Sequence, residues 1–168
     1  TDRIGHRLRR DPDRMKMVLA LTATVRGIPQ IFSGDEQMFT PSGYSHHDGG
    51  LRVDFPGGWK GDRFDLFTEE GRAACDVDFD GSPLREGVRA EVFDYARKLF
   101  TWRKGCKAVQ DGKTLHFLSR ANTGATNITD NTYAYFRYTD TDAVFVYINN
   151  TFEPRALDWN HYREFVAG

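Results

Sequence analysis

The polar residues that could do chemistry lie close together in one stretch of the sequence. In chain order they are Asp35, Glu36, His46, His47, Asp48, Arg52 and Asp54. Asp48 and Arg52 pair a carboxylate with a forked guanidinium, and such a pair can bind neighbouring hydroxyl groups of a sugar. The same side chains can instead form a solvated salt bridge of little energetic value, and the pair alone does not decide between the two.

The sequence His46-His47-Asp48 also has the residue types of a metal site. Adjacent histidines tend to point apart, however, and a tetrahedral zinc site needs more ligands at defined spacing. The two cysteines, Cys75 and Cys106, are too few for a cysteine metal site or a disulfide framework. One disulfide bond and two free thiols both remain open. We therefore expect no metal ion and no cofactor.

A short apolar segment precedes these polar residues, and we expect residues 28–32 to form a buried strand. Pro29 lacks an N–H group, so it belongs near the start of a strand. Gly34 allows a sharp turn directly after the strand. Asp35 and Glu36 would then lie at the carboxyl end of the strand, where ligands bind in parallel α/β folds.

The pattern before this segment predicts a helix over residues 12–26. Asp11 has the residue type of an N-cap, and Pro12 suits the first helical position. The helix is apolar nearly all round, so we expect it to be buried on more than one side. Gly27 is expected to follow its C-cap, and Pro29 prevents it from continuing.

Residues 37–82 show no sustained periodicity and are rich in Gly, Asp and aromatic residues. Such a long connection is either an excursion over a binding face or a disordered linker. The aromatic content favours the excursion. A second helix is expected from Pro83 to Gly105, with Ser82 as N-cap and an apolar stripe. The stripe consists of Leu84, Val88, Val92, Ala96, Leu99 and Trp102.

From Lys113 the apolar period changes to two, which is typical of strands. We expect strands at residues 114–118, 132–138 and 143–148, a hairpin at 140–142, a possible fourth strand at 155–157 and a short helix after Trp159. Residues 120–131 are expected to form a polar loop. This change of period predicts a boundary near residue 105, with an α/β part before it and an antiparallel β part after it.

Composition excludes several classes of function. The 168 residues are 39% hydrophobic and 28% charged, so the chain should fold, and the net charge of −1 gives no broad reason to expect nucleic acid or an anionic membrane as a partner. We also expect no membrane span. Aromatic residues make up 14%, which suits either a β-rich core or a groove for sugar rings. Because the sequence begins with Thr1, we expect it to be part of a longer protein.

Three motifs, taken in order, resemble the α-amylases of glycoside hydrolase family 13. Residues 27–36 are similar to the Gly-x-Pro-x-x-x-x-Gly-x-Glu signature at the eighth strand of that family. Thr1-Asp2-Arg3 is similar to the residues directly after the Asn-His-Asp motif at the seventh strand. Asp48 and Arg52 have the family's Asp-x-x-x-Arg spacing. The run from residue 34 to residue 59 is most similar to neopullulanases and cyclomaltodextrinases.

The resemblance implies that residues 1–105 are the last α-β-α portion of a (β/α)₈ TIM barrel. Residues 106–168 would be part of an antiparallel β-sandwich C-terminal domain. The implied activity is retaining hydrolysis of α-glucosidic bonds in starch, pullulan or cyclodextrin. The two catalytic carboxylates of such an enzyme, about 5–5.5 Å apart, and a third Asp of the family would lie outside this chain. The chain alone is therefore expected to be inactive.

The resemblance also assigns roles to residues of this chain. Asp48, Arg52, Arg3 and His47 are expected to bind the α-glucan. Gly27, Pro29, Gly34, Asp35 and Glu36 are expected to have structural roles at the end of the eighth strand, with Glu36 organising the loop through backbone N–H groups. The resemblance implies a periplasmic or other extracytoplasmic location, which the chain itself does not indicate.

One alternative function concerns the chain as a whole. It could be a non-catalytic carbohydrate-binding or assembly module, with Tyr44, Trp59 and Trp102 stacking on sugars.

The end of a barrel cannot close on itself, so its apolar faces need cover. We therefore expect either self-association or packing of the α/β part on the β part.

Overall fold

The structure is a computed structural model that describes residues 3–39, 51, 52, 55, 62, 65–73, 84–117 and 131–166. The chain divides into two compact units, residues 1–105 and residues 106–168.

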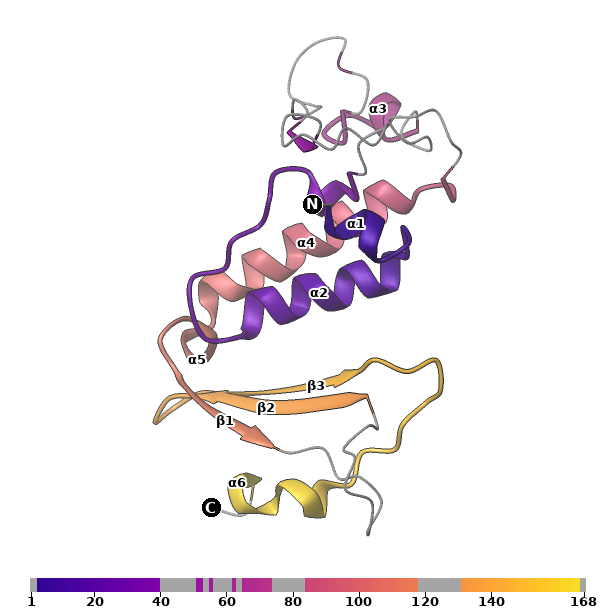
Figure 1. Ribbon diagram of the computed structural model, residues 1–168. Helices are drawn as coiled ribbons and strands as arrows, with labels where there is room; N and C mark the ends of the chain where they lie inside the picture. The colour runs from indigo at the N-terminus through magenta and orange to yellow at the C-terminus, as the bar shows by residue number, and fades with distance from the viewer. Residues whose placement is uncertain are drawn as a thin grey trace. The chain divides into compact units, whose positions relative to one another are not determined.

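The first unit is mainly helical (Figure 1). Its elements are α1 (Ile4–Arg7), α2 (Pro12–Thr24), η1 (Asp35–Gln37), α3 (Glu69–Ala73) and α4 (Val88–Gly105). The helices α2 and α4 lie side by side, and their facing side chains form the core. The buried residues of that core are Met15, Leu19, Met38, Val88, Val92 and Ala96.

The start of α2 agrees with the sequence prediction. Pro12 occupies the first turn, and the Asp11 carboxylate accepts hydrogen bonds from the N–H groups of Asp13 and Arg14. The helix ends at Thr24, and its C-cap, Val25, is extended. Gly27 therefore does not follow the C-cap, although its φ of +126° does use the freedom of glycine.

The predicted burial of α2 on more than one side is not seen in this unit. Among its apolar residues only Met15, Leu19 and Ala23 are buried, and they are spaced four residues apart on one face. The other apolar side chains of the helix are half-buried.

The predicted buried strand at residues 28–32 is wrong for this structure. The five residues have no regular secondary structure, and the Ile28 side chain is 96% exposed. A strand is defined by its ladder of hydrogen bonds to a neighbouring strand. The described residues of the first unit contain no other strand that could supply such a neighbour.

Helix α4 begins later than the sequence pattern predicts. Residues 84–87 are not helical, and Gly87 has a φ of +69° immediately before the first helical residue, Val88. The Gly87 carbonyl accepts a hydrogen bond from the N–H of Glu91, so it opens the helical ladder. The predicted N-cap, Ser82, and Pro83 lie outside the described residues. The predicted apolar stripe is confirmed from Leu84 to Leu99.

The second unit is a three-stranded antiparallel sheet with short helices. Strand β1 (Lys113–Phe117) pairs with β2 (Thr132–Tyr138), which pairs with β3 (Ala143–Asn149). Helix α5 (Lys107–Gln110) precedes the sheet, and η3 (Trp159–Tyr162) and α6 (Arg163–Val166) follow it. The three predicted strands and the short helix at Trp159 are confirmed, within one residue at each strand end.

Two sequence predictions for the second unit need correction. Residues 155–157 are irregular, so the fourth strand is not formed. The described sheet is a single layer packed against helices, and a β-sandwich is not seen in that part of the chain. The predicted hairpin is present, because the Thr139 N–H donates to the Asp142 carbonyl at 2.8 Å. Residues 118–130, which include most of the predicted polar loop, lie outside the described residues.

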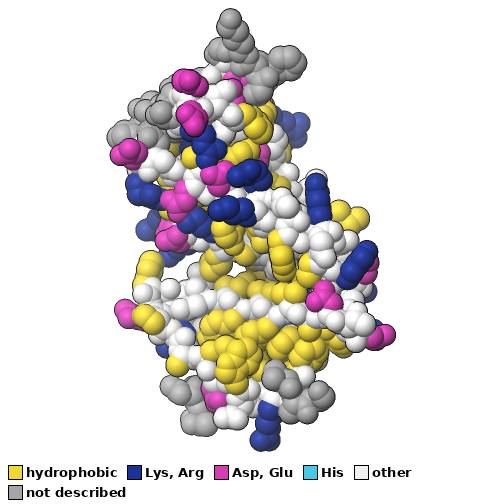
Figure 2. All heavy atoms as spheres, turned by 180° about the vertical axis from the view of Figure 1, so that it is seen from behind, with side chains coloured by type: hydrophobic (Ala, Val, Ile, Leu, Met, Phe, Trp, Pro, Cys, Tyr) yellow, Lys and Arg dark blue, Asp and Glu magenta, His cyan; other side chains and the backbone are white. Residues whose placement is uncertain are grey.

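One face of the sheet is covered by aromatic side chains from the end of the chain. Phe136 of β2 stacks on Phe165 of α6, with ring centroids 4.0 Å apart. Phe145 of β3 contacts Tyr162 and Trp159. Figure 2 shows hydrophobic side chains gathered on one face of this unit. Phe136 and Tyr138 of β2 and Phe145 and Tyr147 of β3 therefore belong to the core on this face.

Cys106 is buried and its thiol is free, whereas Cys75 lies outside the described residues. None of the helices in the described ranges is long and apolar enough to cross a membrane.

Candidate functional site

Three of the predicted site residues, Gly34, Asp35 and Glu36, lie in a tight turn, residues 34–39. Gly34 opens this 34–39 turn with a φ of +95°, and the Phe39 N–H closes it on the Gly34 carbonyl at 3.0 Å. A Cβ atom added to Gly34 would lie 2.0 Å from the Phe39 ring, which is fully buried. Only glycine fits this position, as the sequence predicts for the turn.

Arg3 fixes the 34–39 turn from the N-terminal side. Its Nη1 donates to the Ser33 carbonyl and lies 3.4 Å from Oδ1 of Asp35, and its Nε donates to the Leu51 carbonyl at 2.9 Å. Its guanidinium carbon lies 4.2 Å from the centroid of the Phe32 ring, within the range of a cation–π contact. Arg3 thus joins three segments that are far apart in the sequence.

The Arg3 side chain is only 1% exposed, and the contacts above all go to the protein. The predicted contact between Arg3 and a sugar stays a prediction.

The two carboxyl groups of the turn are partly withdrawn from water. Burial raises the pKa of the Asp35 carboxyl, and the charge and hydrogen bond of Arg3 oppose that rise. Burial also raises the pKa of the Glu36 carboxyl, and the N–H groups of Glu36 and Gly34 oppose it. The Gly34 N–H donates to Oε2 of Glu36 at 3.0 Å, which agrees with the predicted contact of Glu36 with the loop backbone.

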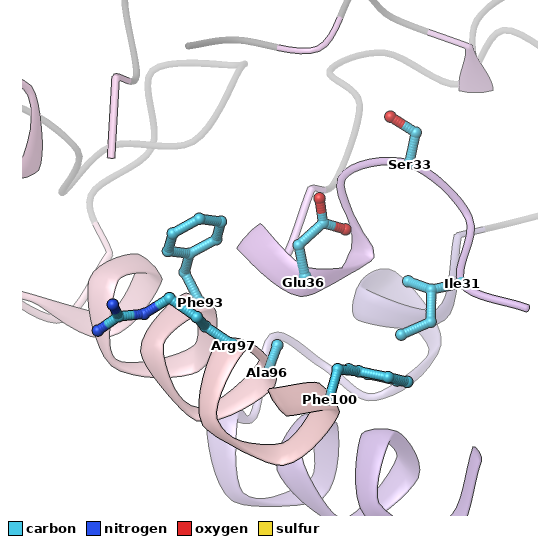
Figure 3. Close-up of a pocket in the computed structure, with 7 residues that line it drawn as sticks. All are labelled: Ile31, Ser33, Glu36, Phe93, Ala96, Arg97 and Phe100. Atoms are coloured by element: carbon cyan, nitrogen blue, oxygen red, sulfur yellow. The ribbon is translucent and has the colours of Figure 1, made fainter. Parts of the chain in front are cut away.

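A pocket of about 440 Å³ lies between the 34–39 turn with its flanking residues and helix α4. Figure 3 shows its lining residues. They are Ile31, Ser33, Glu36, Phe93, Ala96, Arg97 and Phe100. The lining is mainly apolar, so it offers few groups that could bind the hydroxyls of a sugar. Asp48 and Arg52 therefore remain the predicted sugar-binding pair.

The structure brings Arg3, Asp35 and Glu36 together but does not describe the whole predicted site. Arg52 is exposed and directly follows Leu51, whose carbonyl accepts a hydrogen bond from Arg3. His46, His47, Asp48 and Asp54 lie outside the described residues. Gly27 and Pro29 lie in the irregular segment before the turn. Among the described residues, no group of three or more His, Cys, Asp or Glu side chains could hold a metal ion.

Sequence reasoning missed the roles of two residues, Phe39 within the turn and Arg89, which contacts it. Arg89 of α4 is fully buried and donates to the Gln37 carbonyl at 2.8 Å. A signal was present in the sequence. Arg89 precedes Val92 and Ala96 by three and seven residues, so helical spacing places it on the apolar stripe.

Comparison with known proteins gives one match to a protein family. Residues 128–168 match the family model of the cyclo-malto-dextrinase C-terminal domain. The matched segment includes β2, β3, η3 and α6. It supports a C-terminal region of a glycoside hydrolase family 13 enzyme for this part of the chain.

Among solved structures, the chain is similar to an inactive double mutant of MutB in complex with isomaltulose. The sequence identity is 18%, and the alignment covers 84% of this chain and 30% of that chain, with a TM-score of 0.47. This chain thus corresponds to under a third of the length of that structure. A likeness of this size carries no argument about fold or activity.

Proposed function

We propose that this chain is part of a retaining α-glucan hydrolase of the α-amylase family. The observation that carries the proposal is the match of residues 128–168 to the cyclo-malto-dextrinase C-terminal domain. The order of the motifs at residues 1–3, 27–36 and 48–52 supports it independently, because they lie outside the matched residues. The substrate would be starch, pullulan or a cyclodextrin, and within the family neopullulanases and cyclomaltodextrinases are the most similar members.

In this proposal the first unit is the last helix–strand–helix portion of a (β/α)₈ barrel. Residues 28–32 would become the eighth strand once neighbouring strands supply its hydrogen bonds. The exposure of Ile28 (96%) and Phe32 (45%) supports this, because both would be covered inside a barrel.

The residues of this chain would bind and position the glucan rather than cleave it. Asp48 and Arg52 would bind neighbouring sugar hydroxyls, with His47 beside them. Arg3 would hold the Asp35 carboxylate and the Leu51 carbonyl, and so would fix the backbone next to Arg52. No residue of this chain is assigned a catalytic role, because the nucleophile and the acid/base of the family would lie upstream.

Reducing-sugar release from pullulan, cyclodextrin and starch tests the proposal. The longer protein that contains this chain should release sugar, and the 168-residue chain alone should not. Absence of release by the longer protein contradicts the hydrolase. Release by the chain alone contradicts the placement of the catalytic carboxylates outside it.

A carbohydrate-binding or assembly module is the second candidate. It is favoured by Trp102, whose side chain is 42% exposed on α4; Tyr44 and Trp59 lie outside the described residues. Titration of the chain with maltoheptaose, followed by tryptophan fluorescence, separates the two candidates. Tight saturable binding that Trp102→Ala abolishes would favour the module.

A further inference from the structure

Arg89 is a buried cation in the first unit, and its position needs an explanation. Arg89 is 0% exposed, although it belongs to the first turn of α4. Burial of a guanidinium is costly unless its N–H groups find acceptors. Its Nη1 finds one in the Gln37 carbonyl, at 2.8 Å and 52 residues away in the sequence. The buried, charged side chain of Arg89 thus donates a hydrogen bond to the backbone of the 34–39 turn.

The ring of Phe39 gives Arg89 a second contact with the same turn. The guanidinium carbon of Arg89 lies 5.6 Å from the Phe39 centroid, and that of Arg3 lies 5.8 Å from it. Both distances are within the range of cation–π attraction, which is stronger for desolvated groups. Phe39 is fully buried and fills the space where Gly34 has no side chain. The ring is therefore contacted by one arginine from each end of the unit's sequence.

The side chain of Gln37 does not hold the turn by hydrogen bonds. It is fully buried, and its amide nitrogen and oxygen make no hydrogen bond within the described part of the chain. The backbone carbonyl of Gln37 is instead the group through which the turn meets a donor from α4. This carbonyl directly follows the two acidic residues Asp35 and Glu36 in the chain.

We propose that Arg89 is a positioning residue that fixes the 34–39 turn on α4 and thereby sets the directions of the Asp35 and Glu36 carboxylates. It does so through the Gln37 carbonyl and the Phe39 ring, and Arg3 completes the arrangement from the other side. That these carboxylates belong to a glucan site rests on the proposed function. The positioning itself does not.

Local hydrogen exchange of the 168-residue chain tests the positioning. Arg89→Lys keeps the charge but loses the planar fork that stacks on a ring, and Arg89→Met loses the charge as well. Lys98→Met, at an exposed position of the same helix, is the matched control. Exchange at the amides of Gly34 and Phe39 should accelerate about tenfold in both Arg89 variants and not in the control. Equal acceleration throughout the first unit would indicate a merely structural role and overturn the proposal.

A double-mutant cycle tests the contact between Arg89 and Phe39, and a measurement on the unaltered chain keeps the test independent of how well the variants fold. The effects of Arg89→Lys and Phe39→Leu on unfolding should be non-additive, because the two side chains are in contact. In the unaltered chain, nuclear magnetic resonance should detect a slowly exchanging Arg89 guanidinium proton with a cross-peak to the Phe39 ring. Additive effects, or a rapidly exchanging guanidinium without that cross-peak, would overturn the proposal.

Turnover in the longer protein separates this proposal from the proposed function. Arg89→Lys should lower kcat/KM for cyclodextrin about tenfold, and Lys98→Met should leave it unchanged. If the exchange result holds but the longer protein cleaves no glucan, the proposed function fails and the positioning stands. If glucan is cleaved but exchange at Gly34 is unaltered in the Arg89 variants, the positioning fails alone.

Discussion

At the scale of single residues, the 34–39 turn depends on one glycine and on several guanidinium contacts. Arg3 and Arg89 approach the Phe39 ring, and the ring occupies the space beside Gly34. Such an arrangement leaves little freedom for substitution at Gly34, because both the backbone angle and the neighbouring ring oppose a side chain.

Gly34→Ala should therefore destabilise the chain strongly. The φ of +95° is unfavourable for alanine, and the new Cβ would lie 2.0 Å from the Phe39 ring. We expect a loss of about 2–4 kcal/mol in the free energy of unfolding, measured in urea. Gly87→Ala is the control, since its φ of +69° is also positive but no described atom lies within 4 Å of the added Cβ. It should cost about 1 kcal/mol, and equal losses at the two positions would contradict the packing of Phe39 on Gly34.

The raised pKa of Glu36 predicts a pH dependence of stability. A carboxyl whose pKa is higher in the folded state binds more protons folded than unfolded, so its contribution to stability is present at low pH. That contribution is lost as the pH rises above the unfolded value of about 4.3 and through the folded pKa. Glu36→Gln removes the charge, so it should be more stable relative to the parent chain at pH 7 than at pH 4. The exposed Glu86→Gln is the control, and thermal unfolding at both pH values is the measurement.

Sequence reasoning found part of the site at this scale. The contact of Glu36 with backbone N–H groups is implied by the resemblance to family 13. The turn at Gly34 does follow from residue type and position, because that signal is local. The roles of Arg89 and Phe39 do not, because they depend on which residue of α4 faces the turn 50 residues away in the chain. The place of Arg89 on the apolar stripe of α4 is a signal in the sequence, but Arg89 lies outside both the polar cluster at residues 35–54 and the motifs.

At the scale of elements, features that depend on neighbouring residues in the sequence were predicted correctly, and features that depend on distant residues were not. The start of α2, the three strands and the hairpin between β2 and β3 were predictable, because caps, turn residues and the period of two are local signals. The prediction of a strand at residues 28–32 was wrong, because a strand also needs hydrogen bonds to a neighbouring strand. The start of α4 was misplaced because Gly87 interrupts a pattern that continues back to Leu84.

The N-cap of α2 allows a test at this scale. Asp11→Ala should lower the free energy of unfolding by about 1 kcal/mol, because the N–H groups of Asp13 and Arg14 lose their acceptor. Asp11→Ser should restore most of the loss, since a serine hydroxyl can accept from the same N–H groups. Equal stability of Asp11→Ala and the parent chain in urea would show that the cap contributes nothing.

At the scale of the whole molecule, the exposed apolar residues bear on association. In the first unit they include Ile28, Phe32 and Phe67, and in the second Phe152 and Trp159. Exposed apolar groups on a chain of this kind favour association with another surface.

We expect the 168-residue chain to self-associate, and Ile28→Lys to raise the monomer fraction. The reason is that Ile28 is 96% exposed and a charge there opposes apolar contact. Light scattering over a range of concentrations measures it, with Lys98→Ala as a control that removes no apolar surface. A monomeric parent chain would contradict the expectation.

In the proposed function, this chain helps to bind an α-glucan that is cleaved by carboxylates elsewhere in a longer enzyme. The most direct measurement is kcat/KM for cyclodextrin in that enzyme with Arg52→Ala, beside the exposed Arg155→Ala as control. Arg52→Ala would lose a charge-assisted contact worth about 1–3 kcal/mol, so we expect it to lower kcat/KM by about 5- to 150-fold. We expect Arg155→Ala to leave kcat/KM unchanged. An unchanged kcat/KM in the Arg52→Ala enzyme would contradict the account.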